Sequence, residues 1–448
     1  MWNTIFISTE ELMKKTKDII GKSFKELDRL KLLSTQKNDK GILGKVVETG
    51  FYGYPLNNNA EADFANLGIE LKVSGFTTLK KGGWSAKERI SLSQINYNTI
   101  LNYPFELSSV VTKSSKLLFI WYEYVKGIDK GDFIIRDFQL YEISKVEPII
   151  RNDYALIQEK VQSGLAHTLS EGDSVILGAA TKGDSGQKQT QPYSDILAPT
   201  RAFSLKNSFL RGVLNEHREN YNVRLVKELT PEQWVWNQIK DYKGKTQLEI
   251  LQTVEPTYTV SNMPKNLNDM LIKRIIGNKK KLQQNELFSK STYAIKNIPI
   301  DSKYYPIEKA TFHTINIQDF EDSWEESDWK LFFEESTFIY IGYNGKDSNN
   351  KILPNGFRKL HCLFKVTFTA EEVDSFGVTY NLIKEAIQEG DITKLPTATL
   401  YNKLPLVIST KGAKAGAYEL FFSGQNKACF MFNKDFIYQK FKDSEILY

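Results

Sequence analysis

The sequence has little cysteine and little histidine. Its 448 residues include two cysteines and four histidines. Two cysteines are too few for a disulfide framework, so we expect Cys362 and Cys429 to be small buried residues in a reducing cytoplasm. His361 and Cys362 are adjacent, so on a strand they would point to opposite faces and could not share a metal. These scarcities argue against a disulfide-rich secreted protein and against a zinc protein.

Long hydrophobic runs and a leader peptide are also missing. The sequence contains no run of about 18 apolar residues, the length that is typical of a membrane-spanning helix. Its first residues, Met-Trp-Asn-Thr, lack the basic and apolar regions of a signal peptide. We therefore expect a soluble cytoplasmic protein without a membrane partner.

Composition and charge set a broad class. Hydrophobic residues make up 41% and aromatic residues 12% of the chain, which is typical of a well-packed protein. At this length a single compact core is not expected, so two domains are predicted. Lysine and arginine number 59 against 54 acidic residues, a net charge of +5. This mildly basic balance is compatible with a polyanionic partner but does not identify one.

One short stretch carries the pattern of a functional strand. Ile69, Leu71 and Val73 alternate with Glu70 and Lys72, which is the period of a half-buried strand. One face is therefore aliphatic and packs inward. The other face carries a carboxylate and an ammonium group two residues apart, which point the same way.

An aspartate before this strand completes a candidate site. Leu67 and Gly68 suit a tight turn, so Asp63 can fold back beside Glu70. Two carboxylates and a lysine on one surface can hold a divalent cation and orient an attacking water. The alternative is an ordinary hairpin with a polar outer face, and the spacing alone does not decide between the two.

The second half of the sequence echoes the first. Five segments recur in the same order at a nearly constant offset, which predicts a tandem duplication with domains at residues 1–222 and 223–448. The matched segments are 21–27 with 244–250, 117–124 with 338–343, 161–164 with 387–390, 180–183 with 409–412, and 203–206 with 430–433.

The two copies differ at the candidate site. Lys72 is matched by Lys296, but Ala294 stands in place of Glu70 and Leu287 in place of Asp63. A copy without these carboxylates cannot hold the cation. The sequence therefore predicts a single catalytic centre, in the first domain.

Three further segments bear on the fold. Residues 9–33 have the pattern of a helix, and residues 117–124 that of a buried strand. Residues 178–195 are rich in glycine, serine, threonine and glutamine, which predicts a long surface loop of a kind that is often functional.

Several of these segments resemble one family. Residues 40–48 and 63–72 resemble the signature of the MutH family, PD-(D/E)-x-K nucleases that cut at GATC, and the likeness continues through residues 180–182 and 201–207. A tandem pair with one inactive copy is similar to the long type II restriction endonucleases of this family. The resemblance implies an α/β (α+β) fold of two tandem restriction-endonuclease-like domains. Each would be a mixed sheet flanked by helices, the second a degenerate copy.

The resemblance also implies roles for residues at matching positions. Asp63, Glu70 and the backbone carbonyl of Leu71 would bind Mg²⁺, and Glu48 would complete the acidic cluster near the metal. Lys72 would position the attacking water and stabilise charge on the phosphate.

Further lysines are implied more loosely. Lys113 matches a second active-site lysine, with Lys116 as the alternative. The remaining implied residues would contact DNA: Lys182 and Gly183 in a base-reading loop, Ser204 where the family has a tyrosine associated with methylation sensing, Lys206, and Lys411 in the second domain.

The function implied is that of a type II restriction endonuclease. It would hydrolyse double-stranded DNA at GATC sites and leave 5′ phosphates, while the C-terminal domain binds a second DNA site as an effector. One active centre cuts one strand, so a monomer would dimerise on DNA or make two sequential nicks. Two alternatives stay open: a mismatch-repair nickase acting at hemimethylated GATC, and a non-catalytic sequence-specific DNA-binding protein.

Overall fold

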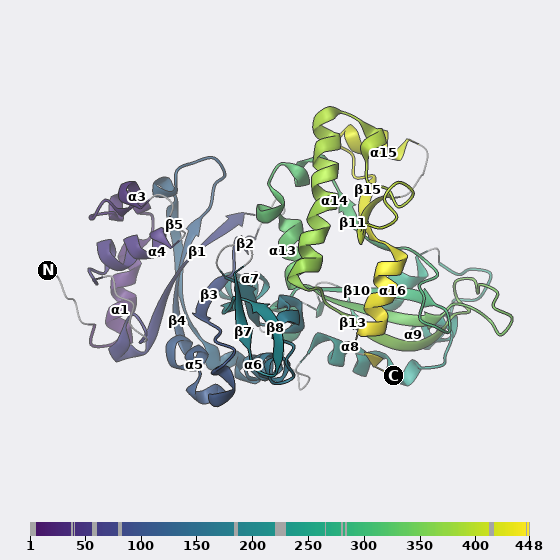
Figure 1. Ribbon diagram of the computed structural model, residues 1–448, viewed down its shortest axis with the longest axis horizontal. Coiled ribbons are helices and arrows are strands. Elements are labelled where there is room, and N and C mark those ends of the chain that lie inside the picture. The colour runs from purple at the N-terminus through teal and green to yellow at the C-terminus, as the bar shows by residue number, and fades with distance from the viewer. Residues whose placement is uncertain are drawn as a thin grey trace. The chain divides into compact units, whose positions relative to one another are not determined.

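The computed structural model describes residues 6–36, 39, 41–55, 61–78, 83–182, 187–219, 230–264, 266–278, 281–282, 285–411, 416–444 and 446–447. The chain divides into two compact units (Figure 1). The first unit comprises Met1–Leu169, Ser174–Val223 and Ser289–Ser291, and the second comprises Ser170–Asp173, Arg224–Phe288 and Thr292–Tyr448.

The first unit is a mixed sheet with helices beside it (Figure 1). Its main sheet has the order β2-β1-β4-β5, in which β1 and β4 are parallel and the other pairs antiparallel. A second sheet has the order β3-β9-β6, and β7 and β8 form a hairpin. The strands are β1 (Ile69–Thr78), β2 (Trp84–Ala86), β3 (Ile90–Gln94), β4 (Lys116–Glu123), β5 (Ile134–Glu142), β6 (Leu177–Thr181), β7 (Lys188–Gln191), β8 (Ser194–Pro199) and β9 (Arg201–Leu205).

The N-terminal helices of the first unit, α1 to α4, cover the apolar face of β1. Ile69 and Leu71 of β1 belong to one buried cluster with Leu12 of α1 and with Ile42 and Val46 of α4. Figure 1 shows α1, α3 and α4 together beside the main sheet. The helices are α1 (Thr9–Thr16), α2 (Phe24–Leu27), α3 (Leu32–Thr35), α4 (Ile42–Val46), α5 (Ser109–Ser114), α6 (Glu147–Gln162) and α7 (Asn207–Glu219).

The predicted helix over residues 9–33 is wrong as a continuous element. The chain turns at Gly21, whose φ of 84° is a conformation that glycine adopts without strain. Ser23 then starts α2 with a capping box, in which its side chain and that of Glu26 each bond the other's backbone N–H. The apolar pattern persists through both helices because both face the same core.

The second unit repeats this topology. Its main sheet has the order β10-β12-β13-β16 with β10 and β12 parallel, and its second sheet has the order β11-β15-β14. The strands are β10 (Tyr293–Ile300), β11 (Ala310–Ile315), β12 (Thr337–Asn344), β13 (Lys359–Val366), β14 (Leu406–Thr410), β15 (Ala428–Phe432) and β16 (Ile446–Leu447). The helices are α8 (Pro231–Ile239), α9 (Gln247–Val254), α10 (Leu267–Leu271), α12 (Glu286–Ser289), α13 (Asp328–Glu335), α14 (Ala370–Glu389), α15 (Ala417–Phe422) and α16 (Lys434–Asp443).

Local details repeat as well. A capping box of Thr246 and Glu249 starts α9, as the box of Ser23 and Glu26 starts α2. In each unit a π-helical turn follows a five-residue helix: η2 (Val47–Phe51) after α4, and η11 (Ile272–Ile276) after α10. The predicted fold class, two tandem mixed-sheet domains, is confirmed.

The predicted surface loop over residues 178–195 is wrong in part. Residues from this segment form most of β6, all of β7 and the start of β8. The small residues Gly178, Ala179 and Ala180 lie buried in β6, paired with β9. Glycine and alanine at these positions therefore reflect close packing rather than a loop.

The cysteines and the hydrophobicity of the helices bear on two of the expectations above. Cys362 and Cys429 are buried and form no disulfide, as predicted. Among the described residues no helix is long and apolar enough to cross a membrane.

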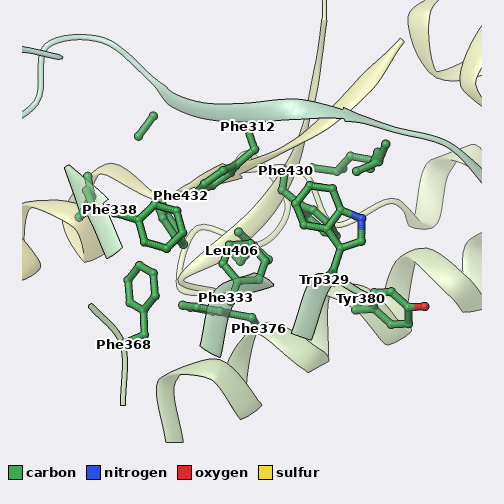
Figure 2. Close-up of a cluster of buried hydrophobic side chains, with 14 of the residues drawn as sticks. Phe312, Trp329, Phe333, Phe338, Phe368, Phe376, Tyr380, Leu406, Phe430 and Phe432 are labelled. Atoms are coloured by element: carbon green, nitrogen blue, oxygen red, sulfur yellow. The ribbon is translucent and has the colours of Figure 1, made fainter. Parts of the chain in front are cut away.

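The core of the second unit is dominated by aromatic rings. Figure 2 shows Phe432 among rings from several helices and strands. Its centroid lies 4.8 Å from that of Phe312, 5.1 Å from that of Phe368 and 5.6 Å from that of Phe376. The contact with Phe312 is edge-to-face and the other two are tilted, and such ring contacts add to the free energy gained by burying the rings.

We expect Phe432→Ala to lower the free energy of unfolding of the second unit by about 3–5 kcal/mol, because it leaves a cavity in a packed core. Urea unfolding followed by tryptophan fluorescence would measure the change, since Trp329 lies in the same cluster. The control is Phe357→Ala, whose side chain is 41% exposed and should shift stability by about 0.5 kcal/mol or less. Equal losses in both variants would contradict this assignment of the core.

Candidate active site

A tight turn brings Asp63 back to the strand that follows it. Residues Ala65–Leu67 form a 3₁₀ turn, and Gly68 adopts a left-handed conformation with φ 64°. Phe64 pairs with Ile69, so the chain reverses at once into β1. The Leu71 N–H donates to Asp63 Oδ2 over 2.8 Å, which fixes the carboxylate beside the strand as the sequence predicted.

Glu70 and Lys72 lie on one face of β1 and are in contact. Lys72 Nζ is 2.9 Å from Glu70 Oε1, and the Asp63 N–H donates to Glu70 Oε2 over 3.3 Å. Glu70 is only 7% exposed, so its interaction with the lysine is little screened by solvent. The structure thus brings Asp63, Glu70 and Lys72 together.

Glu48 joins this group from a different element. It is the second residue of the π-helical turn η2, a type of helical irregularity that is frequent at functional sites. Burial first, and then the nearby charges of Asp63 and Glu70, raise the pKa of Glu48 to about 7. Three carboxyl groups therefore share one half-buried region, and a cation there would relieve their repulsion.

Lys113 is the additional lysine that acts on this group. Burial and Glu70 raise the pKa of Asp63, while its bond to Leu71 and the charges of Lys72 and Lys113 oppose this rise. Lys113 lies in the last turn of α5, whereas Lys116 starts β4 opposite Ile69. This placement favours Lys113 over Lys116 as a site residue.

The donor set fits Mg²⁺. Carboxylates and a backbone carbonyl are the hard oxygen ligands that this ion takes, and it usually keeps several waters beside one or two carboxylates. Among the described residues no three His, Cys, Asp or Glu side chains are arranged to hold a metal by themselves. Asp63, Glu70 and the Leu71 carbonyl would therefore hold it together with water and substrate oxygens, with Glu48 nearby.

The predicted DNA-binding residues fall into two groups. Lys182 and Lys411 are exposed and directly follow β6 and β14. Their backbone N–H groups donate to equivalent carbonyls, Lys182 to Thr200 over 3.0 Å and Lys411 to Lys427 over 2.8 Å. The prediction for Gly183 lies outside the described residues.

Ser204 and Lys206 belong to the interior instead. Ser204 is fully buried and donates to the Gly178 carbonyl, and Lys206 is 1% exposed and donates to the Ser174 carbonyl. A direct contact of either side chain with DNA, as predicted, is therefore not supported. The long apolar stem of Lys206 is covered by the same core that encloses its ammonium group.

The burial of Lys206 points to a residue that sequence reasoning missed. Asp153 is fully buried on α6 and accepts hydrogen bonds from the N–H groups of Val175, Ile176 and Leu177 at 2.7–2.8 Å. Burial raises the pKa of Asp153, and the charge of Lys206 opposes the rise. The pair thus anchors the start of β6, the strand that ends at Lys182. An aspartate on the apolar face of a predicted helix is the sequence pattern that could have identified Asp153.

Comparison with known proteins agrees with this geometry. Residues 52–153 match the family model described as the DNA mismatch repair enzyme MutH, and this segment contains Asp63, Glu70, Lys72 and Lys113. This segment of the first unit is therefore similar to the MutH family. The predicted resemblance is thereby confirmed.

Individual relatives extend the likeness beyond residues 52–153. The chain is 28% identical over 364 residues to the type II restriction enzyme Sau3AI of Staphylococcus aureus, covering 75% of this chain and 72% of that protein. The DNA mismatch repair protein MutH of Vibrio campbellii is 27% identical over 223 residues, 48% of this chain and 96% of the relative. MutH of Pasteurella multocida is 26% identical over 186 residues, 41% and 82% respectively.

The second unit repeats the strand frame of the candidate site without its acids. Ala294 is paired with β12 as Glu70 is paired with β4, and Lys296 lies two residues on, as Lys72 does. Lys273, the second residue of η11, stands where Glu48 stands in η2. Leu287, at the position predicted to match Asp63, is fully buried. Lys296 instead donates to the backbone carbonyl of Thr311.

We expect Lys206→Met to lower the free energy of unfolding by about 3–5 kcal/mol, because it leaves the Asp153 carboxylate buried without its charged neighbour. Urea unfolding at pH 7 would measure the loss. Lys188→Met, an exposed lysine of β7, is the matched control and should be close to neutral. A neutral Lys206→Met variant would mean that the three backbone N–H groups alone stabilise Asp153.

Lys296 predicts a pH dependence of stability. Burial, and then repulsion from Lys411, lower its pKa from 10.5 to about 8. Between pH 8 and 10.5 the unfolded chain therefore binds a proton at this lysine that the folded chain does not bind. The free energy of unfolding is highest above this range, falls as the pH falls from 10.5, and has lost this contribution below pH 8. Lys296→Met should be more stable than the unmodified protein at pH 7, and the difference should shrink toward pH 10. Chemical unfolding across this range would measure it, and a constant difference would contradict the lowered pKa.

Proposed function

We propose that the protein is a Mg²⁺-dependent type II restriction endonuclease. It hydrolyses phosphodiester bonds of double-stranded DNA at GATC sites and leaves 5′ phosphates. The observation that carries the proposal is the contact of Lys72 with Glu70 beside Asp63, in a chain that is similar to a type II restriction enzyme over 75% of its length. The target sequence rests on the family resemblance.

Each side chain of the site has a separate task. Asp63, Glu70 and the Leu71 carbonyl would hold the ion, and Glu48 would add negative charge beside them. Lys72, held by Glu70, orients the attacking water and stabilises negative charge that develops on the phosphate. Lys113 adds positive charge near Asp63. When bound, Mg²⁺ lowers the pKa of a bound water and neutralises phosphate charge.

The second unit serves as a DNA-binding effector in this proposal. It keeps Lys411 at the position of Lys182 but lacks the carboxylates needed for hydrolysis. DNA bound there would stimulate cleavage by the first unit. Because one active centre cuts one strand, a double-strand break requires two chains on the DNA or two successive nicks.

The test is cleavage of a plasmid with GATC sites, with Mg²⁺ and with EDTA. We expect linear fragments with GATC ends from the unmodified protein, none with EDTA, and a loss of at least about 10³-fold in rate for Glu70→Ala and Lys72→Ala, since each removes a group that acts on the reacting phosphate. Sequencing the fragment ends identifies the target. Glu106→Ala, at an exposed carboxylate that pairs with Arg151, is the matched control and should cut normally.

Other outcomes favour the alternatives. Nicked circles alone, from hemimethylated plasmid only, would favour a repair nickase; the relatives that cover about half of this chain are described as DNA mismatch repair proteins. Binding to duplex DNA without any Mg²⁺-dependent product would favour a non-catalytic DNA-binding protein. Plasmids methylated on adenine or on cytosine would show which modification protects the site.

A further inference from the structure

The second unit reverses the charge of the active site. Where the first unit has Glu70, the second has Ala294, and Lys296 is left without the carboxylate that Lys72 contacts. Lys296 turns instead to the second sheet, where it donates to the Thr311 carbonyl on β11. Its ammonium group lies 4.9 Å from the centre of the Phe312 ring. The second unit therefore keeps the lysine and lacks its partner acids.

Two other lysines approach the same place. Lys411 Nζ lies 3.1 Å from the Phe312 carbonyl and 3.4 Å from Thr311 Oγ1, so it reaches the same two residues of β11 as Lys296. Lys411, Lys296 and Lys309 are the charges that act on the thiol of Cys429 in the neighbouring strand β15. Lys296 and Lys411 thus meet at Thr311 and Phe312 of β11, and Lys309 directly precedes this strand.

No carboxylate neutralises this cluster within the described part of the chain. The contacts of Lys296 and Lys411 are with carbonyl and hydroxyl oxygens, which are uncharged, and none of the three lysines forms an ion pair with a described residue. Each ammonium has three donors, and a single carbonyl contact leaves donors available. An anion that accepts several hydrogen bonds would satisfy these donors and neutralise the positive charge.

We propose that Lys296, Lys309 and Lys411 form an anion site that holds a backbone phosphate of duplex DNA. Lys309 and Lys411 are exposed and Lys296 lies deeper, so the cluster offers positive charge from the surface inward. A phosphodiester carries one charge and accepts hydrogen bonds on two free oxygens, so it can bridge two neighbouring ammonium groups. This deepens the proposed function, on which it rests, by naming the contact that the second unit makes with its DNA.

The arrangement also explains why Lys296 is not simply a structural tie. A lysine that only joined β10 to β11 would be better replaced by an apolar side chain, since burial and Lys411 both disfavour its charge. A bound phosphate would instead favour the charged form of Lys296. The site is therefore positively charged where the first unit is acidic, and it shares one position with the acidic site, that of Lys296 and Lys72.

The test uses the full chain in a Glu70→Ala background, which prevents cleavage, and a short duplex containing one GATC site. Isothermal titration should give two duplexes per chain. Adding Lys296→Met and Lys411→Met should leave one, or weaken the second by about tenfold or more for each lysine. The slope of log affinity against log salt should fall in magnitude by about 0.9 for each DNA phosphate that the variant no longer neutralises.

Matched variants separate this site from the first unit and from loss of fold. Lys403 is an exposed lysine that precedes β14, whereas Lys411 follows this strand. The Lys403→Met variant should still bind two duplexes. Lys182→Met should weaken the duplex that remains in the Lys296→Met, Lys411→Met protein. Thermal melting should show that Lys296→Met is folded, since it removes a buried charge.

Three results would overturn the site. The first is two duplexes bound with unchanged affinity in the double variant. The second is a single duplex per chain that only Lys182→Met weakens. The third is competition by inorganic phosphate at Lys296 without any effect of DNA, which would indicate a site for a free anion. In each case Mg²⁺-dependent cleavage by the unmodified protein, measured separately, would leave the proposed endonuclease standing; absence of cleavage would reject that function instead.

Discussion

The parallel pairing of β1 with β4 is the constraint on which the active site depends. Its register places Glu70 opposite Leu117 and Lys72 opposite Phe119. A slip of one residue would turn both charged side chains into the core and Leu71 outward. Since the interior of β4 is buried throughout, that slip would cost the burial of several apolar side chains. The hydrophobic sequence of one strand therefore fixes the geometry of the polar residues on its neighbour.

The second unit indicates how little of the fold depends on the acids themselves. Ala294 and Lys296 keep the pairing with β12 that Glu70 and Lys72 have with β4, although the carboxylate is absent. The sheet is held by its apolar side chains and by the aromatic cluster around Phe432, against which Ala294 itself packs. A scaffold stabilised in this way allows its polar face to change charge while the backbone stays the same.

The parts of the structure that depend on short-range pattern could be predicted from sequence. Alternation along β1 and the turn at Gly68 placed Asp63 beside the strand correctly. The roles of Ser204 and Lys206 could not be predicted, because their burial depends on contacts with β6 and with a helix far away in the sequence. Composition misled over residues 178–195, where small residues in a close-packed strand resemble those of a loop.

The two units pose one electrostatic problem with opposite signs. In the first, burial and the neighbouring acids raise the pKa of Glu48; in the second, burial and a neighbouring lysine lower the pKa of Lys296. Like charges gathered in half-buried positions cost free energy, so a chain selected for stability alone would replace them. The presence of such a cluster in each copy of the repeated fold is explained when a ligand of opposite charge binds each one. In the proposed function, duplex DNA would be the common complement of both sites, with a metal ion at one unit and a backbone phosphate at the other.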